Sequence, residues 1–308
     1  MQASRDDSVW DLYWEMRLQA LENLGKRAAI VAASALVRRL AEAGGPVALL
    51  ELGCGEAQVL GALADAHGGI NGMRASVGVD YNPRSLARAR LDYPGLRFIE
   101  GDFTDPALLN GLGKFQVVLL VNALHEVFSA TFSEDKGEVD VPLARQRVEQ
   151  ALALASGCLS PGGWLVLFDG LEPPGDLCEP VRIRFLDAQA RASFTRFARE
   201  YRPFRITYRE LSEPLCIELP HRDFTRYIDK SIFLEKNLWE TERLESYQYF
   251  TEDDFRAAFA CQGLNISELR TLTENEEKWR QCVEILTPGV VFPQEHILIL
   301  AQAGTGGG

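Results

Sequence analysis

The fold is decided by the stretch LLELGCGEA, which covers residues 49–57. Its first four residues are apolar apart from Glu51, as expected of a buried strand, and a helical pattern begins directly after the glycines. Gly53 and Gly55 permit a tight turn and let a ligand approach the backbone without meeting a Cβ atom. The stretch therefore predicts a strand, a glycine turn and a helix.

Short apolar runs alternate with helical patterns on both sides of this stretch. The runs cover 47–52, 76–79, 96–99, 115–121 and 164–168, and helical stretches lie near 57–67, 84–92, 105–112 and 143–158. Apolar runs that are each followed by a helix are typical of parallel strands buried on both faces. The sequence predicts an open α/β sheet, in which ligands bind beyond the carboxyl ends of the strands.

The remaining segments differ in pattern from this α/β core, which we assign to residues 46–169. Apolar residues recur at helical spacing within 9–40, so residues 1–45 are expected to form an N-terminal helical lid. Residues 170–250 break the alternation and are expected to form an inserted substrate cap. Thr251 and Asp254 form a capping box that opens a helix, and strands are expected at 264–272 and 296–301. Residues 251–303 would therefore complete the core sheet, and 304–308 form a flexible tail.

Composition excludes several classes of protein. The chain has 308 residues, a formal net charge of −12 and 46% apolar residues, which is typical of a globular protein rather than a disordered or collagen-like one. The acidic balance argues against nucleic-acid binding. No stretch resembles a signal peptide or a membrane span, and the six cysteines form no CxxC pair. We expect a cytoplasmic monomer or homodimer with no membrane partner and no zinc site.

Carboxylates follow the next two predicted strands after the glycine turn. Asp80 ends the second strand, where an acid can accept both hydroxyls of a ribose. Asp102 follows the third strand beside Phe103, and such a pair can bind the amino group of an adenine and cover its ring. These side chains are expected at the sheet edge where the glycine turn lies.

Two classes of nucleoside ligand compete for this edge. A dinucleotide fingerprint requires a third glycine, but Gln58 occupies that position. Glu56 would also repel a pyrophosphate at the start of the helix. Acidic groups at the turn, including Glu51, suit a ligand that bears an amino group. S-adenosylmethionine is such a ligand.

Five motifs, in their order and spacing, resemble those of the class I S-adenosylmethionine-dependent methyltransferase family: ELGCGEA, VGVDYNP, EGDF, VVLLVNALHEV and LSPGGWLVLFD. The stretch YFTEDDFRAAFACQGL resembles the segment before the sixth strand in the small-molecule branch. The resemblance covers about 46–169 and 247–303, and departs from many members at Ala57, where they have a third glycine. It implies a Rossmann-like seven-stranded sheet, mostly parallel with an antiparallel last strand. It also implies an S-adenosylmethionine site formed by Glu51, Gly53, Cys54, Gly55, Asp80, Tyr81, Asp102, Phe103 and Asn122.

Candidate catalytic residues follow the fourth predicted strand, where the acceptor should meet the methyl group. His125 titrates near neutrality, and Glu126 can orient it or change its pKa. The alternative is that His125 caps a turn or packs against the insertion. The sequence lacks the motifs of base or glutamine N-methyltransferases and the Pro-Cys of cytosine-C5 enzymes. It also lacks the acid clusters of metal-dependent enzymes, so no metal is expected.

The expected cap contains the candidates for acceptor binding. Eight arginines against four acids between 176 and 209 suggest an acidic acceptor, although a solvated helix face is the simpler interpretation. Aromatic side chains of the insertion either face the acceptor or belong to the core, and aromatics near residue 14 either cover the cofactor or only attach the first helix. The acceptor candidates are Trp14, Arg182, Tyr208, His221 and Tyr247.

The leading hypothesis is metal-independent methyl transfer to the O, N or S atom of a small molecule by in-line displacement. The alternative is a protein of the same fold that binds S-adenosylmethionine without transferring the methyl group. A nicotinamide-dependent oxidoreductase is disfavoured by Glu51, Glu56 and Gln58.

Overall fold

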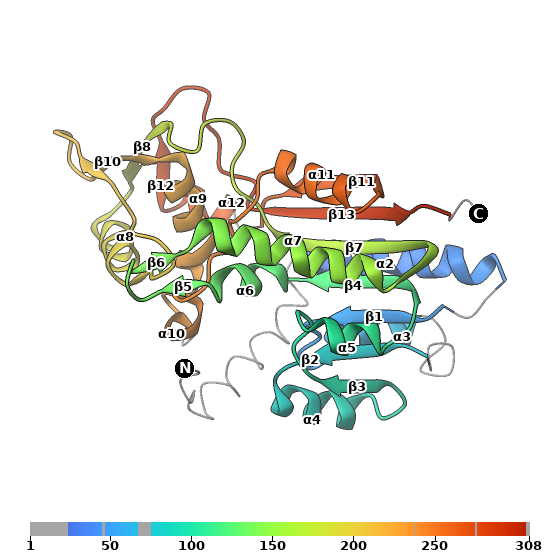
Figure 1. The fold of residues 1–308 in the computed structure, drawn as a ribbon. Helices are drawn as coiled ribbons and strands as arrows, with labels where there is room; N and C mark the ends of the chain where they lie inside the picture. Colours follow the sequence, from blue (N-terminus) through green and yellow to red (C-terminus); the bar gives the residue numbers. More distant parts are fainter. Residues whose placement is uncertain (1–23, 45–46, 67–74, 237, 275, 306–308) are drawn as a thin grey trace.

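The computed structural model describes residues 24–44, 47–66, 75–236, 238–274 and 276–305. The large sheet consists of β1 (Leu49–Leu52), β2 (Val77–Asp80), β3 (Arg97–Glu100), β4 (Phe115–Val121), β7 (Leu159–Gly170), β11 (Leu264–Leu272) and β13 (His296–Ala303). The strand order is β11-β13-β7-β4-β1-β2-β3 (Figure 1). Only β13 runs against its neighbours β7 and β11, so the expected parallel sheet with an antiparallel last strand is confirmed.

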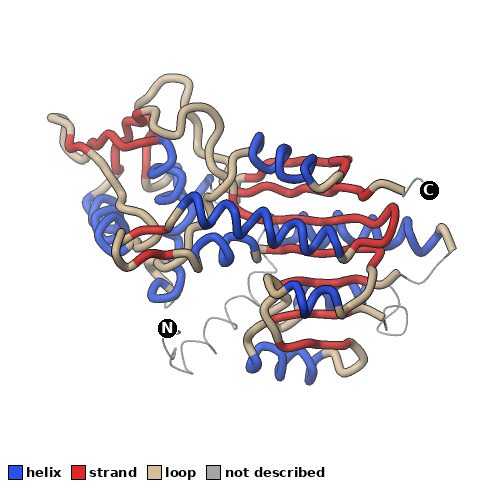
Figure 2. Tube along the Cα trace, in the orientation of Figure 1, coloured by secondary structure: helices blue, strands red, loops and turns tan. Residues whose placement is uncertain are grey.

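Helices cover both faces of this sheet. One face is covered by α2 (Leu24–Glu42), α3 (Gln58–Ala66) and α4 (Pro83–Asp92). The other is covered by α5 (Pro106–Asn110), α6 (Leu124–Ser129), α7 (Val141–Gly157) and α11 (Glu252–Cys261) (Figure 2). Side chains alternate along each strand, so that Leu49 packs in one core while Leu50 and Leu52 pack in the other. The result is a three-layer α/β fold.

Side-chain caps are present where helices begin, and one of them was predicted from the sequence. Thr251 and Asp254 form the expected capping box of α11. Asn82 accepts the backbone N–H groups of the first turn of α4, and Pro83 starts that helix. Each cap fixes where a chain segment leaves the sheet edge.

A smaller antiparallel sheet lies beyond the carboxyl ends of the parallel strands (Figure 1). Its strands are β8 (Pro180–Phe185), β9 (Arg209–Glu210), β10 (Cys216–Pro220) and β12 (Val283–Ile285), in the order β12-β8-β10-β9. It is accompanied by α8 (Ala188–Glu200), α9 (His221–Lys230), η3 (Ser231–Phe233), α10 (Trp239–Glu242) and α12 (Glu276–Arg280). A two-stranded hairpin, β5 (Phe132–Ser133) with β6 (Glu138–Val139), lies between α6 and α7.

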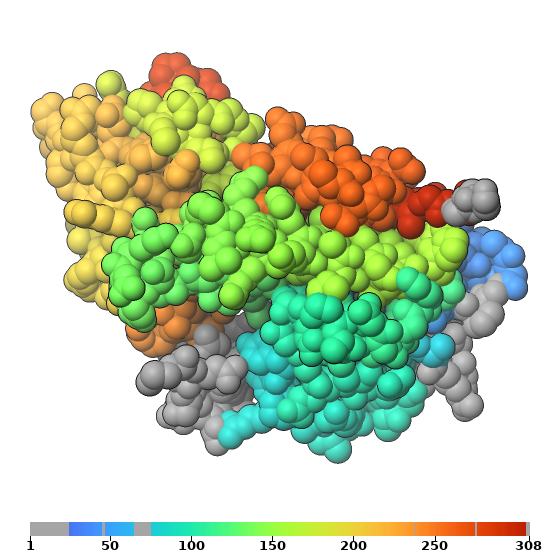
Figure 3. Space-filling model, in the orientation of Figure 1, coloured from blue at the N-terminus to red at the C-terminus, as the bar shows by residue number. Residues whose placement is uncertain are grey.

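The small sheet takes its strands from two separate parts of the chain. Strand β12 follows β11 in the sequence, yet it pairs with β8 of the preceding insertion. The segment that was expected only to complete the core sheet therefore also contributes an edge strand to the small one. In the space-filling view, the small sheet and its helices form a continuous body with the core (Figure 3).

Candidate active site

The glycine turn between β1 and α3 is held against β2. The backbone N–H groups of Gly53 and Cys54 both donate to the carbonyl of Val79, at 2.9 and 3.0 Å. Gly53 has φ +73°, and a Cβ atom there would lie 3.0 Å from Cβ of Ala123. Both the left-handed backbone and the close approach of the β4 loop therefore favour glycine.

Asp80 joins this turn to the end of β2. Its Oδ2 accepts the N–H of Gly55 at 2.7 Å, and its Oδ1 accepts the N–H of Asn82 at 2.8 Å. A carboxylate has about four lone-pair positions, so it can accept further hydrogen bonds from a ligand. Asp80 thus shapes the turn and presents acceptor capacity at the sheet edge.

Glu51 is a buried carboxyl directly below the glycine turn. Its Oε2 accepts the N–H of Leu60 in the first turn of α3, at 3.1 Å. Burial raises the pKa of Glu51 to about 8, an effect that this hydrogen bond and the charge of Lys26 oppose and the charge of Asp80 supports. The carboxyl is therefore poised to ionise when a cation approaches.

Two buried polar atoms beside the turn have no hydrogen-bond partner among the described residues. One is the side-chain oxygen of Asn122, a residue at φ +53° after β4, and the other is the amide nitrogen of Gln58 at the start of α3. An oxygen that lacks a donor suits a ligand ammonium group, and an N–H that lacks an acceptor suits a ligand carboxylate. Gln58 was not expected to bind the ligand, because only its failure to match a glycine pattern was visible in the sequence.

Cys54 forms part of the wall of the turn. It is buried, and its thiol lies close to the position that a Cβ on Gly78 would occupy. Burial and the charges of Glu51 and Asp80 raise the pKa of the Cys54 thiol well above its usual range. Cys54 is therefore a neutral packing group.

A cleft of about 650 Å³ opens beyond the ends of β2, β3 and β4. Four residues predicted from the sequence lie on its walls: Tyr81, Asp102 and Phe103, all expected to hold the cofactor, and Glu126, expected in catalysis. Asp102 also accepts the N–H and hydroxyl of Thr104, at 2.8 and 2.7 Å, which fixes its carboxylate. The carboxyl ends of neighbouring strands thus bring together side chains that are distant in sequence.

His125 occupies a different position from the one expected at the cleft. Its side chain is fully buried, and Nδ1 lies 2.7 Å from Oδ1 of Asp169 at the end of β7. The ring packs on Tyr247, with 4.1 Å between the ring centroids. Burial lowers the pKa of His125, but the charges of Asp169, Glu245 and Glu126 outweigh it and raise that pKa.

The other acceptor candidates do not gather around the cleft. Arg182 lies on β8, where alternate residues point outward, and its Nε donates to Glu218 at 2.8 Å. Tyr208 is 38% exposed and packs edge-on against Phe194. His221 begins α9, and burial lowers its pKa. Of these candidates, Tyr247 packs against His125, and Trp14 lies outside the described residues.

The arginines of the small-sheet region pair with acids on the surface. Six of the eight arginines between 176 and 209 form ion pairs with glutamates. This pairing supports the interpretation of a solvated surface over that of a site for an acidic acceptor.

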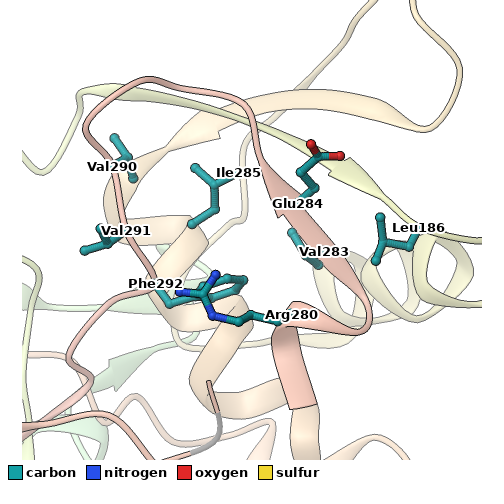
Figure 4. A pocket seen from close by; sticks show the side chains of 8 residues that line it. All are labelled: Leu186, Arg280, Val283, Glu284, Ile285, Val290, Val291 and Phe292. Carbon is teal, nitrogen blue, oxygen red and sulfur yellow. The ribbon is translucent and has the colours of Figure 1, made fainter. Parts of the chain in front are cut away.

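A second, smaller cavity of about 420 Å³ lies on the small sheet (Figure 4). Residues of β12 form one side, and the chain that follows, including Val290, Val291 and Phe292, forms the other. Its lining is mainly aliphatic, with Arg280 and Glu284 at the rim. None of the predicted site residues lines it.

The described stretches of the chain contain neither a candidate membrane span nor a candidate metal-binding cluster. None of the helices in these stretches is long and apolar enough to span a bilayer. No group of three or more His, Cys, Asp or Glu side chains within the same stretches is arranged to hold a metal ion.

Comparison with protein families bears directly on this site. Residues 50–167, which include the glycine turn, Asn122 and most of the residues that line the cleft, match the family model described as a methyltransferase domain. This part of the chain is a methyltransferase domain. This match agrees with the expected resemblance to the class I S-adenosylmethionine-dependent methyltransferases and supports S-adenosylmethionine as the cofactor of this domain.

Solved structures with a similar chain course are also methyltransferases by description. An O-methyltransferase family protein from Burkholderia thailandensis is 14% identical, with a TM-score of 0.45 over 91% of this chain and 59% of that one. An S-adenosylmethionine-dependent methyltransferase from Mesorhizobium loti is 16% identical, with a TM-score of 0.45 over 87% and 95%. An O-methyltransferase family 2 protein from Planctomyces limnophilus, solved with apigenin, is 15% identical, with a TM-score of 0.46 over 98% and 62%.

The chain thus spans about three fifths of the length of the first and third of these proteins. A search of curated proteins found no match.

The side chains of the methyltransferase domain fit its cofactor. The buried carboxyl of Glu51 and the unpartnered oxygen of Asn122 provide acceptors for an ammonium group. Asp80 retains acceptor capacity for hydroxyls, and Phe103 and Asp102 wall the cleft beside it. The buried Gln58 amide nitrogen supplies a donor for a carboxylate. These groups match the charges and polar atoms of an adenosyl amino acid.

Proposed function

We propose that this methyltransferase acts on a small-molecule acceptor bound in the cleft beyond β4. The observation that carries the proposal is the lining of that cleft by separate parts of the chain. Tyr81, Asp102 and Phe103 follow β2 and β3, whereas Glu126 lies on α6 and Glu245 follows α10. A volume of about 650 Å³ is in the range of small-molecule sites.

The roles of the cofactor-binding residues follow from their positions. Glu51 and Asn122 would hold the ammonium group of the methionine part, and Asp80 would accept the ribose hydroxyls. Asp102 would accept the adenine amino group while Phe103 covers the ring. Gly53, Cys54 and Gly55 form the turn beneath them, and Tyr81 shields the open side.

Methyl transfer is an in-line displacement in which the bound cofactor supplies an electrophilic methyl group. The chain's task is to align the acceptor and exclude water, and placement of this kind contributes on the order of 7–11 kcal/mol in favourable cases. We propose that no metal takes part and that the O, N or S atom of the acceptor is the nucleophile. Leu244 and Glu245, which follow α10, support a role of the insertion as a cap over the acceptor.

His125 and Glu126 are the proposed catalytic residues. Because His125 is fully buried, it would act by holding charge and orientation behind the cleft wall, while Glu126 faces the cleft. His125→Ala should lower turnover far more than affinity for S-adenosylhomocysteine. Unchanged turnover at saturating acceptor would remove His125 from the mechanism.

The experiment that tests the function is transfer of label from methyl-labelled S-adenosylmethionine to pooled metabolites, with identification of the labelled product. A parallel reaction with a chelator tests the independence from metal. The second candidate function is cofactor binding without transfer, and it would give a measurable affinity for S-adenosylhomocysteine but no labelled product from any pool. We further propose a cytoplasmic monomer or homodimer that engages neither nucleic acid nor membrane.

A further inference from the structure

We infer that Glu245 is the proton acceptor of the cleft, and that the buried His125–Asp169 pair supports it from behind. This inference rests on the proposed function and deepens it, because it limits the acceptor to molecules whose nucleophilic atom carries a proton. Glu245 follows α10, 120 positions after His125 in the chain, and no sequence motif points to it.

The geometry links Glu245 to His125. Nε2 of His125 lies 3.9 Å from Oε2 of Glu245, and neither atom has a hydrogen-bond partner among the described residues. The other ring nitrogen is committed to Asp169 at 2.7 Å. The His125 side chain is fully buried, whereas the Glu245 side chain is 13% exposed and lines the cleft. Glu245 is thus the point at which this buried pair meets an acceptor.

Neighbouring contacts fix the segment that carries Glu245. The N–H of Ser246 donates to Oγ of Ser129 at 2.9 Å, and that hydroxyl donates to the carbonyl of His125 at 2.7 Å. A Cβ atom on Gly170 would overlap the carbonyl of Tyr247, so only glycine lets the segment pack against the end of β7. The segment is therefore held to α6 and to β7, the two elements that carry His125 and Asp169.

Charges surround His125 from each element that packs on it. Asp169 faces it from β7, Glu126 from α6, and Glu245 from the segment after α10. Lys230 lies 3.7 Å from the centroid of the Tyr247 ring and binds Glu242 at 2.6 Å. Three carboxylates near one imidazole favour its protonated form. An imidazolium 3.9 Å behind Glu245 attracts that carboxylate and holds it in place at the cleft.

The cleft lining agrees with such an acceptor. Its charged groups are the carboxylates of Asp102, Glu126 and Glu245 and the guanidinium of Arg147. An excess of carboxylates disfavours an anionic acceptor and favours hydroxyl or ammonium compounds.

The proton and electron balance is simple. A lone pair of the acceptor's O or N atom forms a bond to the methyl carbon, the carbon–sulfur bond breaks with its electron pair left on sulfur, and the acceptor's proton passes to the Glu245 carboxylate and then to water. For an ammonium acceptor, the same proton leaves before attack, because the nitrogen has no lone pair until then. A thioether would need no such step.

The first test measures the coupling without requiring turnover. The full chain, loaded with S-adenosylhomocysteine, is titrated by NMR on the His125 ring, which is assigned with His125→Gln. Glu245→Gln should lower the pKa of His125 by about one unit, as expected on loss of a nearby opposite charge. Glu240→Gln, the same change on an exposed residue paired with Arg243, should leave it unchanged. Equal pKa values of His125 in the wild type and in Glu245→Gln would overturn the pairing of His125 with Glu245.

The second test uses acceptors that share a benzene ring and differ in the nucleophile: phenol, benzylamine and the thioether thioanisole, together with any acceptor found in the label screen. Glu245→Gln should lower kcat for hydroxyl or amine acceptors by about 100-fold, with the affinity for S-adenosylhomocysteine within twofold of wild type. Glu240→Gln should match the wild type. The reaction with phenol tests removal of a proton from a hydroxyl group, and the reaction with benzylamine tests removal of a proton from an ammonium group.

Three outcomes remain distinct. Transfer to thioanisole alone, or a kcat unaffected by Glu245→Gln, overturns the role of Glu245 while leaving the methyltransferase function intact. Absence of transfer by the wild type to any acceptor refutes the proposed function, and the NMR titration still decides the pairing. If Glu245→Gln fails to fold, Glu245→Asp, which keeps the charge but retracts it by one methylene, replaces it and should lower kcat while retaining the raised pKa of His125.

Discussion

Replacing Glu51 with glutamine removes a buried ionisable group while preserving its shape and its acceptor for the Leu60 N–H. Burial raises the pKa of Glu51 from 4.5 to about 8 in the folded protein. Between these values the folded state binds a proton that the unfolded state has released, so the free energy of unfolding falls as the pH rises. Below pH 4.5, Glu51 has little effect on the free energy of unfolding. Above about pH 8, the loss of unfolding free energy caused by Glu51 is complete.

The size of the effect follows from the two pKa values. At 1.36 kcal/mol per pH unit, the gap between 4.5 and about 8 corresponds to about 5 kcal/mol. At pH 7 the loss amounts to about 3 kcal/mol. Glu51→Gln should therefore match the wild type near pH 4, exceed it by about 3 kcal/mol at pH 7, and exceed it by about 5 kcal/mol at pH 9.

The measurement is denaturant unfolding of both proteins from pH 4 to pH 9 without cofactor. The difference in unfolding free energy between variant and wild type removes the contributions of other buried acids. One of these is Glu295, because burial raises its pKa to about 7. Glu100→Gln, on the exposed end of β3, controls for the loss of one negative charge. A difference that stays constant across this pH range would refute the reasoning.

The same carboxyl links stability to ligand binding. If Glu51 holds the ammonium group, binding of S-adenosylhomocysteine at pH 7 ionises it and releases a proton. Calorimetry in buffers of different ionisation enthalpy measures that release, and Glu51→Gln should abolish it. Proton release that persists in the variant would assign it to another group.

Three further predictions concern the turn and the arginine surface. In Asp80→Asn, the amide nitrogen replaces one of the two oxygens that accept the N–H groups of Gly55 and Asn82. The variant should lose about 1–3 kcal/mol of unfolding free energy, which denaturation would measure. It should also bind S-adenosylhomocysteine more weakly, which calorimetry would measure. Gly53→Ala forces a Cβ into left-handed backbone 3.0 Å from Cβ of Ala123 and should cost about 1–3 kcal/mol, whereas an unchanged melting temperature would contradict the strain argument. Arg182→Ala removes an exposed ion pair and should change the free energy of unfolding by less than about 1 kcal/mol. Label transfer should remain intact. A loss of transfer would indicate that Arg182 binds the acceptor after all.

Strand positions and the meeting of side chains at one sheet edge could be predicted because local patterns determine them. The apolar run at 115–121 and the strand expected at 264–272 coincide with β4 and β11, and the acid that ends β2 contacts the glycine turn because neighbouring parallel strands end at one edge. Such features depend on spacing within a few residues, and that spacing can be read directly from the sequence.

Features formed by long-range packing could not be predicted. Glu245 reaches His125 only because the segment after α10 packs on α6 and β7, and no periodic pattern encodes that contact. Strand β12 has three residues, too few to show alternation. The pairing of Arg182 with Glu218 likewise depends on the register of two strands 36 residues apart in the chain.

The sharing of the small sheet between two chain segments has a consequence for engineering acceptor specificity. Transplanting only the insertion from a related enzyme would bring β8 without the edge strand β12 that covers it, and would leave an open ladder of backbone groups prone to aggregation. A functional chimera must therefore exchange two stretches together, the one before α11 and the one after β11. A nascent chain likewise cannot close this sheet until β12 has been synthesised, well after β8 and β10.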